Sequence, residues 1–138
     1  MTIEAARVAI TAQFDAALAA YPTTKPVVQY PNRNLVDTTT QVLPWIELDI
    51  VNLSGMQLDL GPKPMSVQYG QIIVTAYSKE NAGARDAGML LDYFLPWLEL
   101  RNLGIVRTHS GMYSKSTVAK GWEGFPVTVP FWWTRVAP

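Results

Sequence analysis

Cysteine is missing from this chain, and histidine occurs only once, as His109, among 138 residues. Without cysteine there is no disulfide, no thiolate nucleophile and no cysteine-based metal site, and the composition fits a cytosolic setting. A transition-metal site is equally unsupported, because no second histidine is present to share the ligation. These absences remove several common classes of catalytic and metal-binding protein.

Charged residues are few and balanced. Lysine and arginine number 11, aspartate and glutamate number 11, and the net charge is zero. No basic run occurs, so the composition disfavours a protein that binds nucleic acid through its phosphates. Glu4, Arg7 and Asp15 interrupt the apolar residues at the start of the chain. We therefore expect neither a signal peptide nor a membrane span there.

Motifs for catalysis are also missing. The glycines form neither G-x-G-x-x-G nor G-x-x-x-x-G-K, so no phosphate cradle is indicated. Ser110 follows His109 directly, but neighbours in a strand point to opposite faces, and no G-x-S-x-G accompanies them. We expect His109 to be a surface or loop residue. The sequence predicts a protein that is not an enzyme and needs no cofactor.

The composition nevertheless permits a folded core. Apolar residues make up 49% of the chain and charged residues 16%, which excludes a disordered protein. We expect one soluble, intracellular domain spanning residues 1–138. Periodicity predicts helices at 2–20 and 82–100, strands at 27–30, 45–53 and 67–77, and two or three further strands within 105–135.

This order of elements predicts an α+β fold: a mostly antiparallel sheet with two helices packed on one face. Residues 67–77 are apolar on both faces, which indicates a central strand. Pro96 lies inside the second helical pattern, so we expect a kink or a restart there.

The connection at residues 54–66 is long for a hairpin loop. In it Met56, Leu58 and Leu60 alternate with Gln57 and Asp59, which predicts a projecting hairpin arm. We interpret Met56, Leu58 and Leu60 as contacts for a partner subunit. The alternative is a loop that folds back on its own core.

The segment 121–133 holds three of the five tryptophans and alternates like a strand. Pro126 and Pro130 share one parity and lack N–H groups, which suggests an edge strand, or one with bulges. Phe131 and Trp133 take the opposite parity and are expected to fill the core. Trp132 is then the best candidate for a contact with a partner protein, since one small core does not need aromatic side chains from both faces of the same strand.

Glu47 and Asp49 place two carboxylates on one strand face, about 7 Å apart by the strand rise. A pair of acids at such spacing is also found in glycosidases. The favoured interpretation is a polar, exposed strand face, because this alternation is common in antiparallel sheets.

Several short motifs follow one another along nearly the whole chain: Pro-Asn at 31–32, PWIEL at 44–48, QYGQIIV at 68–74, GARDA at 83–87, GW at 121–122 and VTVPF at 127–131. After an alanine-rich first helix, this order resembles the tail terminator proteins of long-tailed bacteriophages. The resemblance implies a homo-hexameric ring that caps the head-proximal end of the tail tube, stops tube polymerisation and offers a surface to the neck.

The resemblance also implies partners and location. The partners are other copies of the chain, the tail tube protein and a head-side neck or connector protein, with no membrane and no sequence-specific nucleic acid, although DNA passes through the ring. The location is the virion tail, after assembly in the host cytoplasm. A closed ring needs two different patches on each subunit, for which the arm and residues 125–133 are candidates.

Within such a ring, Glu47 and Asp49 are candidates for the lumen wall, where negative charge repels DNA phosphates. Two alternatives stay open. One is another head–tail joining or neck protein, and the other is a small-molecule-binding or enzymatic α+β domain that uses the Glu47 and Asp49 face. A concave site holding both acids would favour the latter.

Overall fold

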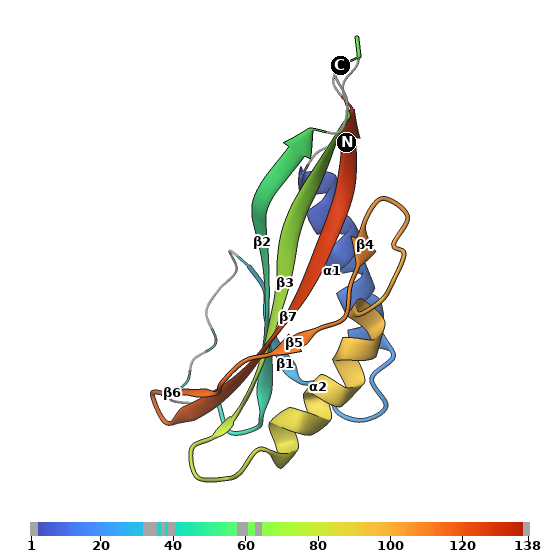
Figure 1. The fold of residues 1–138 in the computed structure, drawn as a ribbon. Helices are drawn as coiled ribbons and strands as arrows, with labels where there is room; N and C mark the ends of the chain where they lie inside the picture. Colours follow the sequence, from blue (N-terminus) through green and yellow to red (C-terminus); the bar gives the residue numbers. More distant parts are fainter. Residues whose placement is uncertain are drawn as a thin grey trace.

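The structure is a computed structural model that describes residues 3–31, 36, 38, 41–57, 61–62 and 65–136, with only the backbone described at 3, 54, 56, 57 and 136. Two helices and seven strands follow in the order α1 (Ile3–Ala19), β1 (Val27–Gln29), β2 (Trp45–Gln57), β3 (Met65–Lys79), α2 (Arg85–Leu98), β4 (Arg107–Thr108), β5 (Met112–Tyr113), β6 (Thr117–Ala119) and β7 (Trp122–Val136). Figure 1 shows the three long strands beside the two helices.

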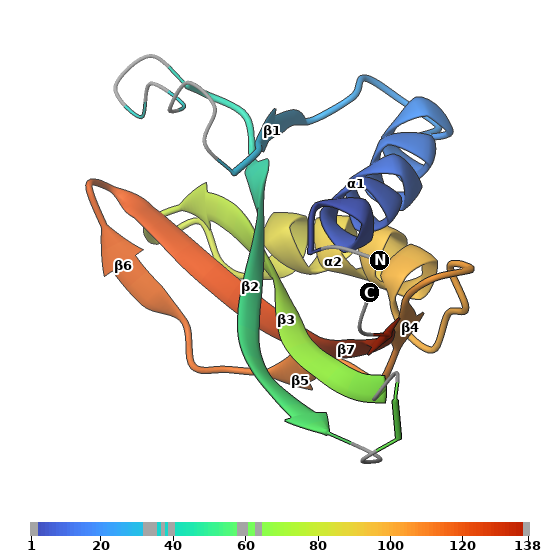
Figure 2. The ribbon, with the colours of Figure 1, turned by 90° about the horizontal axis from the view of Figure 1, so that it is seen from above.

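The sheet has the order β1-β2-β3-β7-β4, and β5 and β6 also pair with β7. Among the described strands only β1 runs parallel to its neighbour; β2, β3 and β7 are antiparallel over their whole paired lengths. Both helices lie on one face of this sheet (Figure 2). The fold is therefore α+β with a mostly antiparallel sheet, as the sequence predicts, and β3 is central.

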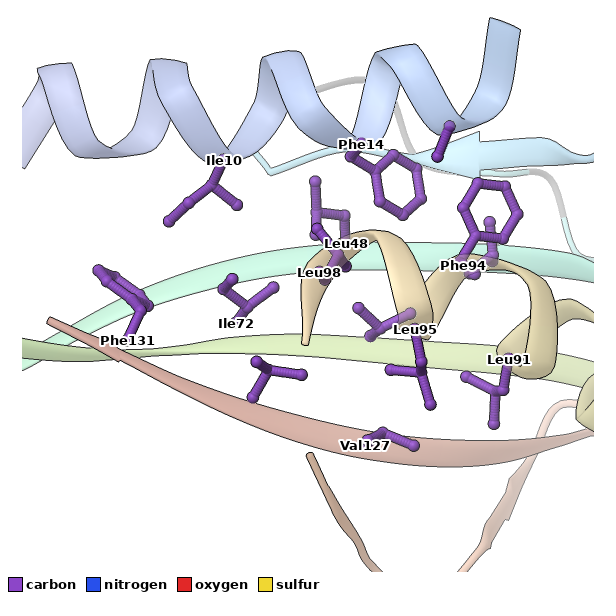
Figure 3. Close-up of a cluster of buried hydrophobic side chains, with 14 of the residues drawn as sticks. Ile10, Phe14, Leu48, Ile72, Leu91, Phe94, Leu95, Leu98, Val127 and Phe131 are labelled. Carbon is purple, nitrogen blue, oxygen red and sulfur yellow. The ribbon is translucent and has the colours of Figure 1, made fainter. Parts of the chain in front are cut away.

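The core lies between the helices and that face of the sheet. Figure 3 shows Ile10 and Phe14 of α1 pointing toward the sheet, and Leu95 lying between α2 and the strands. Alternation in the strands supplies the other half of the core, because one parity of each strand points inward. The fully buried strand residues include Ile46, Leu48, Ile72, Val74, Val127, Val129 and Phe131.

The second helix differs from its expected form. It runs from Arg85 to Leu98 without interruption at Pro96, which lies in its last turn. Proline costs a helix the hydrogen bond of its own missing N–H and crowds the preceding turn. Only Trp97 and Leu98 follow Pro96 in α2, so the helix ends soon after it instead of restarting. The expected start of the first helix, Thr2, lies outside the described residues.

The position of β7 corrects the expectation of an edge strand. β7 pairs with β3 on one side along 15 positions and with β4, β5 and β6 on the other. The carbonyl oxygens of Pro126 and Pro130 accept hydrogen bonds from Ser114 and His109 on that second side. Proline has no N–H group to donate, and at both prolines the position of that absent donor is on the same, second side of β7. The partners on that side are three short strands instead of one long strand.

Candidate interaction surfaces

The face of the sheet that carries no helix is partly apolar. Glu47 of β2 lies opposite Thr75 of β3, which lies opposite Pro126 of β7. In the same way Asp49 of β2 lies opposite Ile73 of β3, which lies opposite Thr128 of β7. Further along the same face come Val51, Gln71, Pro130, Tyr69 and Trp132. We call this set of side chains the helix-free face; most of its members are half-buried.

Glu47 and Asp49 lie together on this face, as the alternation predicts. Burial raises the pKa of Glu47, and the nearby charge of Asp49 raises it further. Burial also raises the pKa of Tyr77, with a smaller contribution from the charge of Glu47. Among the described side chains, the ion pair found is that of Arg7 with Glu4 on α1. No described cation therefore pairs with Glu47 or Asp49 to compensate their charges.

Trp132 points away from the core, whereas its neighbours Phe131 and Trp133 are 1% and 2% exposed. Its parity was therefore predicted correctly, although β7 is not an edge strand. The guanidinium of Arg107 lies 5.6 Å from the centroid of the Trp132 ring. A cation over an aromatic ring in this range is attractive, so β4 helps to hold the indole in place.

The predicted arm is the outer end of the β2–β3 ladder. The strands stay paired as far as Gln57 and Ser66, after a bulge at Asn52 and Ser54. The described end lies away from both helices (Figure 2). Leu53, at the bulge, is 55% exposed, so this described part does not fold back on the core.

The arm residues chosen from the sequence fall at the limit of the described chain. The backbone of Met56 pairs with Val67, but its side chain is not described. Leu58 and Leu60 lie outside the described residues. Their role as partner contacts stays a prediction.

The sequence did not predict a cavity of about 330 Å³ beside β1. It lies between the start of α2 and residues 41–44 and is lined in part by Val27, Leu43 and Met89, which are 44%, 62% and 57% exposed. A signal was present, because Met89 falls outside the apolar stripe that α2 turns to the core. Val42, which lies between the lining residues Gln41 and Leu43, is 71% exposed.

Three further exposed apolar side chains, which the sequence did not single out, lie in the short strands on the far side of β7. Met112, Tyr113 and Val118 of β5 and β6 are 56%, 69% and 54% exposed. Exposed apolar residues that stand singly are common and carry no signal in a sequence.

The structure adds nothing in favour of catalysis at His109. Its side chain is exposed, and Ser110 Oγ contacts the carboxylate of Glu99 at 3.4 Å instead of the imidazole.

Neither of the two cavities described contains Glu47 or Asp49. In the described ranges no cluster of three acid, histidine or cysteine side chains is placed to hold a metal, and none of the helices there is long and apolar enough to cross a membrane.

Comparisons with known proteins add information about the fold. No protein-family model matches the chain, and no curated protein matches it. Twelve chains of solved structures match. One of them, a protein whose name states no function, superposes with a TM-score of 0.66 at 15% identity, over 100% of this chain and 99% of that chain. At this identity the likeness shows that the two chains share a fold along their whole length.

Proposed function

We propose that the protein is a structural virion protein of a long-tailed bacteriophage that forms a ring on the head-proximal end of the tail tube. The ring stops tube polymerisation and presents a surface to the neck of the head. The ordered motifs from residue 31 to residue 131 support this assignment, and the α+β fold is compatible with it.

One observation carries the proposal, namely the apolar character of the helix-free face. An antiparallel sheet that faces only water is expected to be polar on that side. Here Ile73, Pro130 and Trp132 are among its half-buried members. Aromatic and apolar side chains held on a broad surface are typical of contacts between proteins.

The two ends of this face receive different roles in the proposal. Glu47 is aligned with Pro126 through β3, and Trp132 lies six positions further along β7 (132 − 126), which corresponds to about 20 Å. We assign the acidic end, with Glu47 and Asp49, to the lumen wall that DNA passes. We assign the Trp132 end, together with the arm, to contacts with neighbouring subunits or the tube.

Two other functions compete with this one. A head–tail joining or neck protein would use similar surfaces, and the gene order separates the two, since we expect this gene to lie just before that of the major tube protein. A small-molecule-binding domain would need a concave site at Glu47 and Asp49. Neither described cavity lies there.

The decisive assay measures tube elongation. Tube protein of the same phage is polymerised with and without this protein, and tube lengths are measured by electron microscopy. The proposal predicts that substoichiometric amounts stop elongation. Continued growth at a saturating concentration, with the protein folded, contradicts it.

A further inference from the structure

In the part of the chain that the structure describes, β2 has a strand on both sides at its start and on one side beyond it. β1 pairs with residues 45–47, whereas β3 follows β2 on the other side as far as Gln57. Figure 2 shows β1 beside the start of β2. We call the uncovered side of residues 48–57 the β2 edge. An open edge presents backbone groups that pair readily with another chain.

The register of the sheet shows which backbone groups point to the β2 edge. In an antiparallel sheet the N–H and C=O of one residue point to the same side, and this side alternates along the strand. The carbonyl oxygen of Pro126 accepts a hydrogen bond from Ser114, on the side of β7 away from β3. Thr75, opposite Pro126, therefore points its backbone groups toward Glu47, and Glu47 points its own toward β3. By alternation the residues that point to the β2 edge before the bulge are Leu48, Ile50 and Asn52.

A carboxylate holds one of these outward N–H groups. The backbone N–H of Ile50 donates a hydrogen bond to Oδ1 of Asp49, at 2.9 Å. A side chain that accepts from a neighbouring backbone N–H gives that group an alternative to a sheet ladder. Another strand would have to displace the carboxylate before it could pair with Ile50.

A bulge limits the β2 edge a little further along. The register of β2 against β3 shifts between Asn52 and Ser54. A bulge disrupts the regular ladder and is one of the features by which proteins prevent pairing at an edge. The regular part of the edge between β1 and the bulge spans residues 48–52, and Ile50 is its middle residue.

The composition of this stretch favours strand pairing. Residues 46–51 read IELDIV, in which four of six side chains are apolar and three are β-branched. Such segments associate edge to edge unless charges or other features oppose it. Glu47 and Asp49 both carry charge, but among the described residues it is Asp49 that accepts a hydrogen bond from an outward N–H of the β2 edge.

We propose that Asp49 guards the β2 edge: by holding the N–H of Ile50, it prevents another copy of the chain from adding its own β2 there. The excluded strand is a second β2 because every copy carries the same open edge at the same concentration. This role goes beyond the proposed function. It concerns the free protein and holds with or without a ring.

Asp49→Ala removes the acceptor, and amide hydrogen exchange followed by NMR at low and high protein concentration measures the consequence. At low concentration the protection factor of the Ile50 amide should fall roughly fivefold, the effect of losing one hydrogen bond of ordinary net strength. At high concentration the variant should pair through the β2 edge. The Ile50 and Asn52 amides should then become more protected, whereas the Val51 amide, which points to β3, should not change.

The parent protein should show no such dependence on concentration. Protection of Ile50 and Asn52 that rises with concentration in the parent overturns the inference, as does an Asp49→Ala variant that stays folded and unassociated. Circular dichroism checks the folding of each variant. Asp49→Val also lacks the acceptor, and its β-branched side chain favours a strand, so it serves in place of Asp49→Ala if that variant does not fold.

Glu47→Ala is the matched control, because it removes the same charge from the same strand face and leaves the bond between Asp49 and Ile50 in place. It should not associate. Asp49→Asn keeps an oxygen that can accept the bond but removes the charge, so it should associate roughly fivefold more weakly than Asp49→Ala. If Glu47→Ala or Asp49→Asn associates as strongly as Asp49→Ala, charge and not the hydrogen bond keeps the copies apart, and the inference is wrong.

Discussion

Gly70 of β3 and Phe131 of β7 are paired across the centre of the sheet, and the phenyl ring occupies the space that a side chain at Gly70 would need. A Cβ placed on Gly70 would lie 2.4 Å from Phe131 Cζ and 2.6 Å from the backbone oxygen of Val51. The glycine therefore allows a large aromatic ring to pack directly against a central strand.

Gly70→Ala should destabilise the protein by about 2–3 kcal/mol, because the backbone oxygen of Val51 cannot move aside as a flexible side chain would. Urea unfolding followed by circular dichroism measures this. Gly88→Ala is the matched control: its Cβ meets nothing within 4 Å, and in the interior of α2 the change should stabilise by about 0.5–1 kcal/mol. Equal effects of the two substitutions would refute this packing argument.

Glu47→Gln should make the protein more stable at neutral pH. The folded state raises the pKa of Glu47, first through burial and then through Asp49. The folded state therefore binds the proton more tightly than the unfolded state, and stability falls as the pH rises through the folded pKa. The advantage of Glu47→Gln should disappear at pH values below the unfolded pKa of glutamate, about 4.3.

Unfolding free energies measured between pH 3 and pH 8 test this expectation. Glu80→Gln serves as the control, since Glu80 is exposed on a turn. A Glu47→Gln variant that is less stable than the parent at pH 7 would show that the carboxylate has a stabilising partner.

Trp132 and Trp133 are adjacent but should respond differently to truncation. Trp133→Ala removes a side chain that is 2% exposed and should cost about 3–5 kcal/mol. Trp132→Ala removes a half-buried side chain from the helix-free face and should cost only about 1 kcal/mol. If Trp132→Ala leaves ring assembly and tube capping intact, the interface role of Trp132 is wrong.

Leu53→Ser tests the described part of the arm. Leu53 is 55% exposed, so its loss should change the unfolding free energy by less than about 0.5 kcal/mol. Binding to tube ends, measured by co-sedimentation, should weaken. Val8→Ser, a change at a comparably exposed position on α1, should leave binding unchanged. Equal binding by both variants would remove the described arm from the interface.

Strand alternation predicted much of the fold, because the parity of a side chain follows directly from its place in the sequence. It placed Phe131 and Trp133 in the core, turned Trp132 away from it, and put Glu47 and Asp49 on one face. It could not predict the neighbours of β7. Pro126 and Pro130 exclude a continuous ladder on one side, and both an edge strand and a strand bordered by short segments satisfy that condition.

The cavity beside β1 was harder to predict for a different reason. Met89, Leu43 and Val27 come from three separate elements, and only the packing of α2 against the sheet brings them to one cavity. Exposure of single apolar residues is common and carries no signal by itself. Their grouping depends on the tertiary structure.

Cryo-electron microscopy of tail tubes incubated with the protein tests the central claim most directly. The account predicts a closed ring of copies on one end of each tube. Protein spread along the tube wall, or tube ends left bare at a saturating concentration of folded protein, would contradict it.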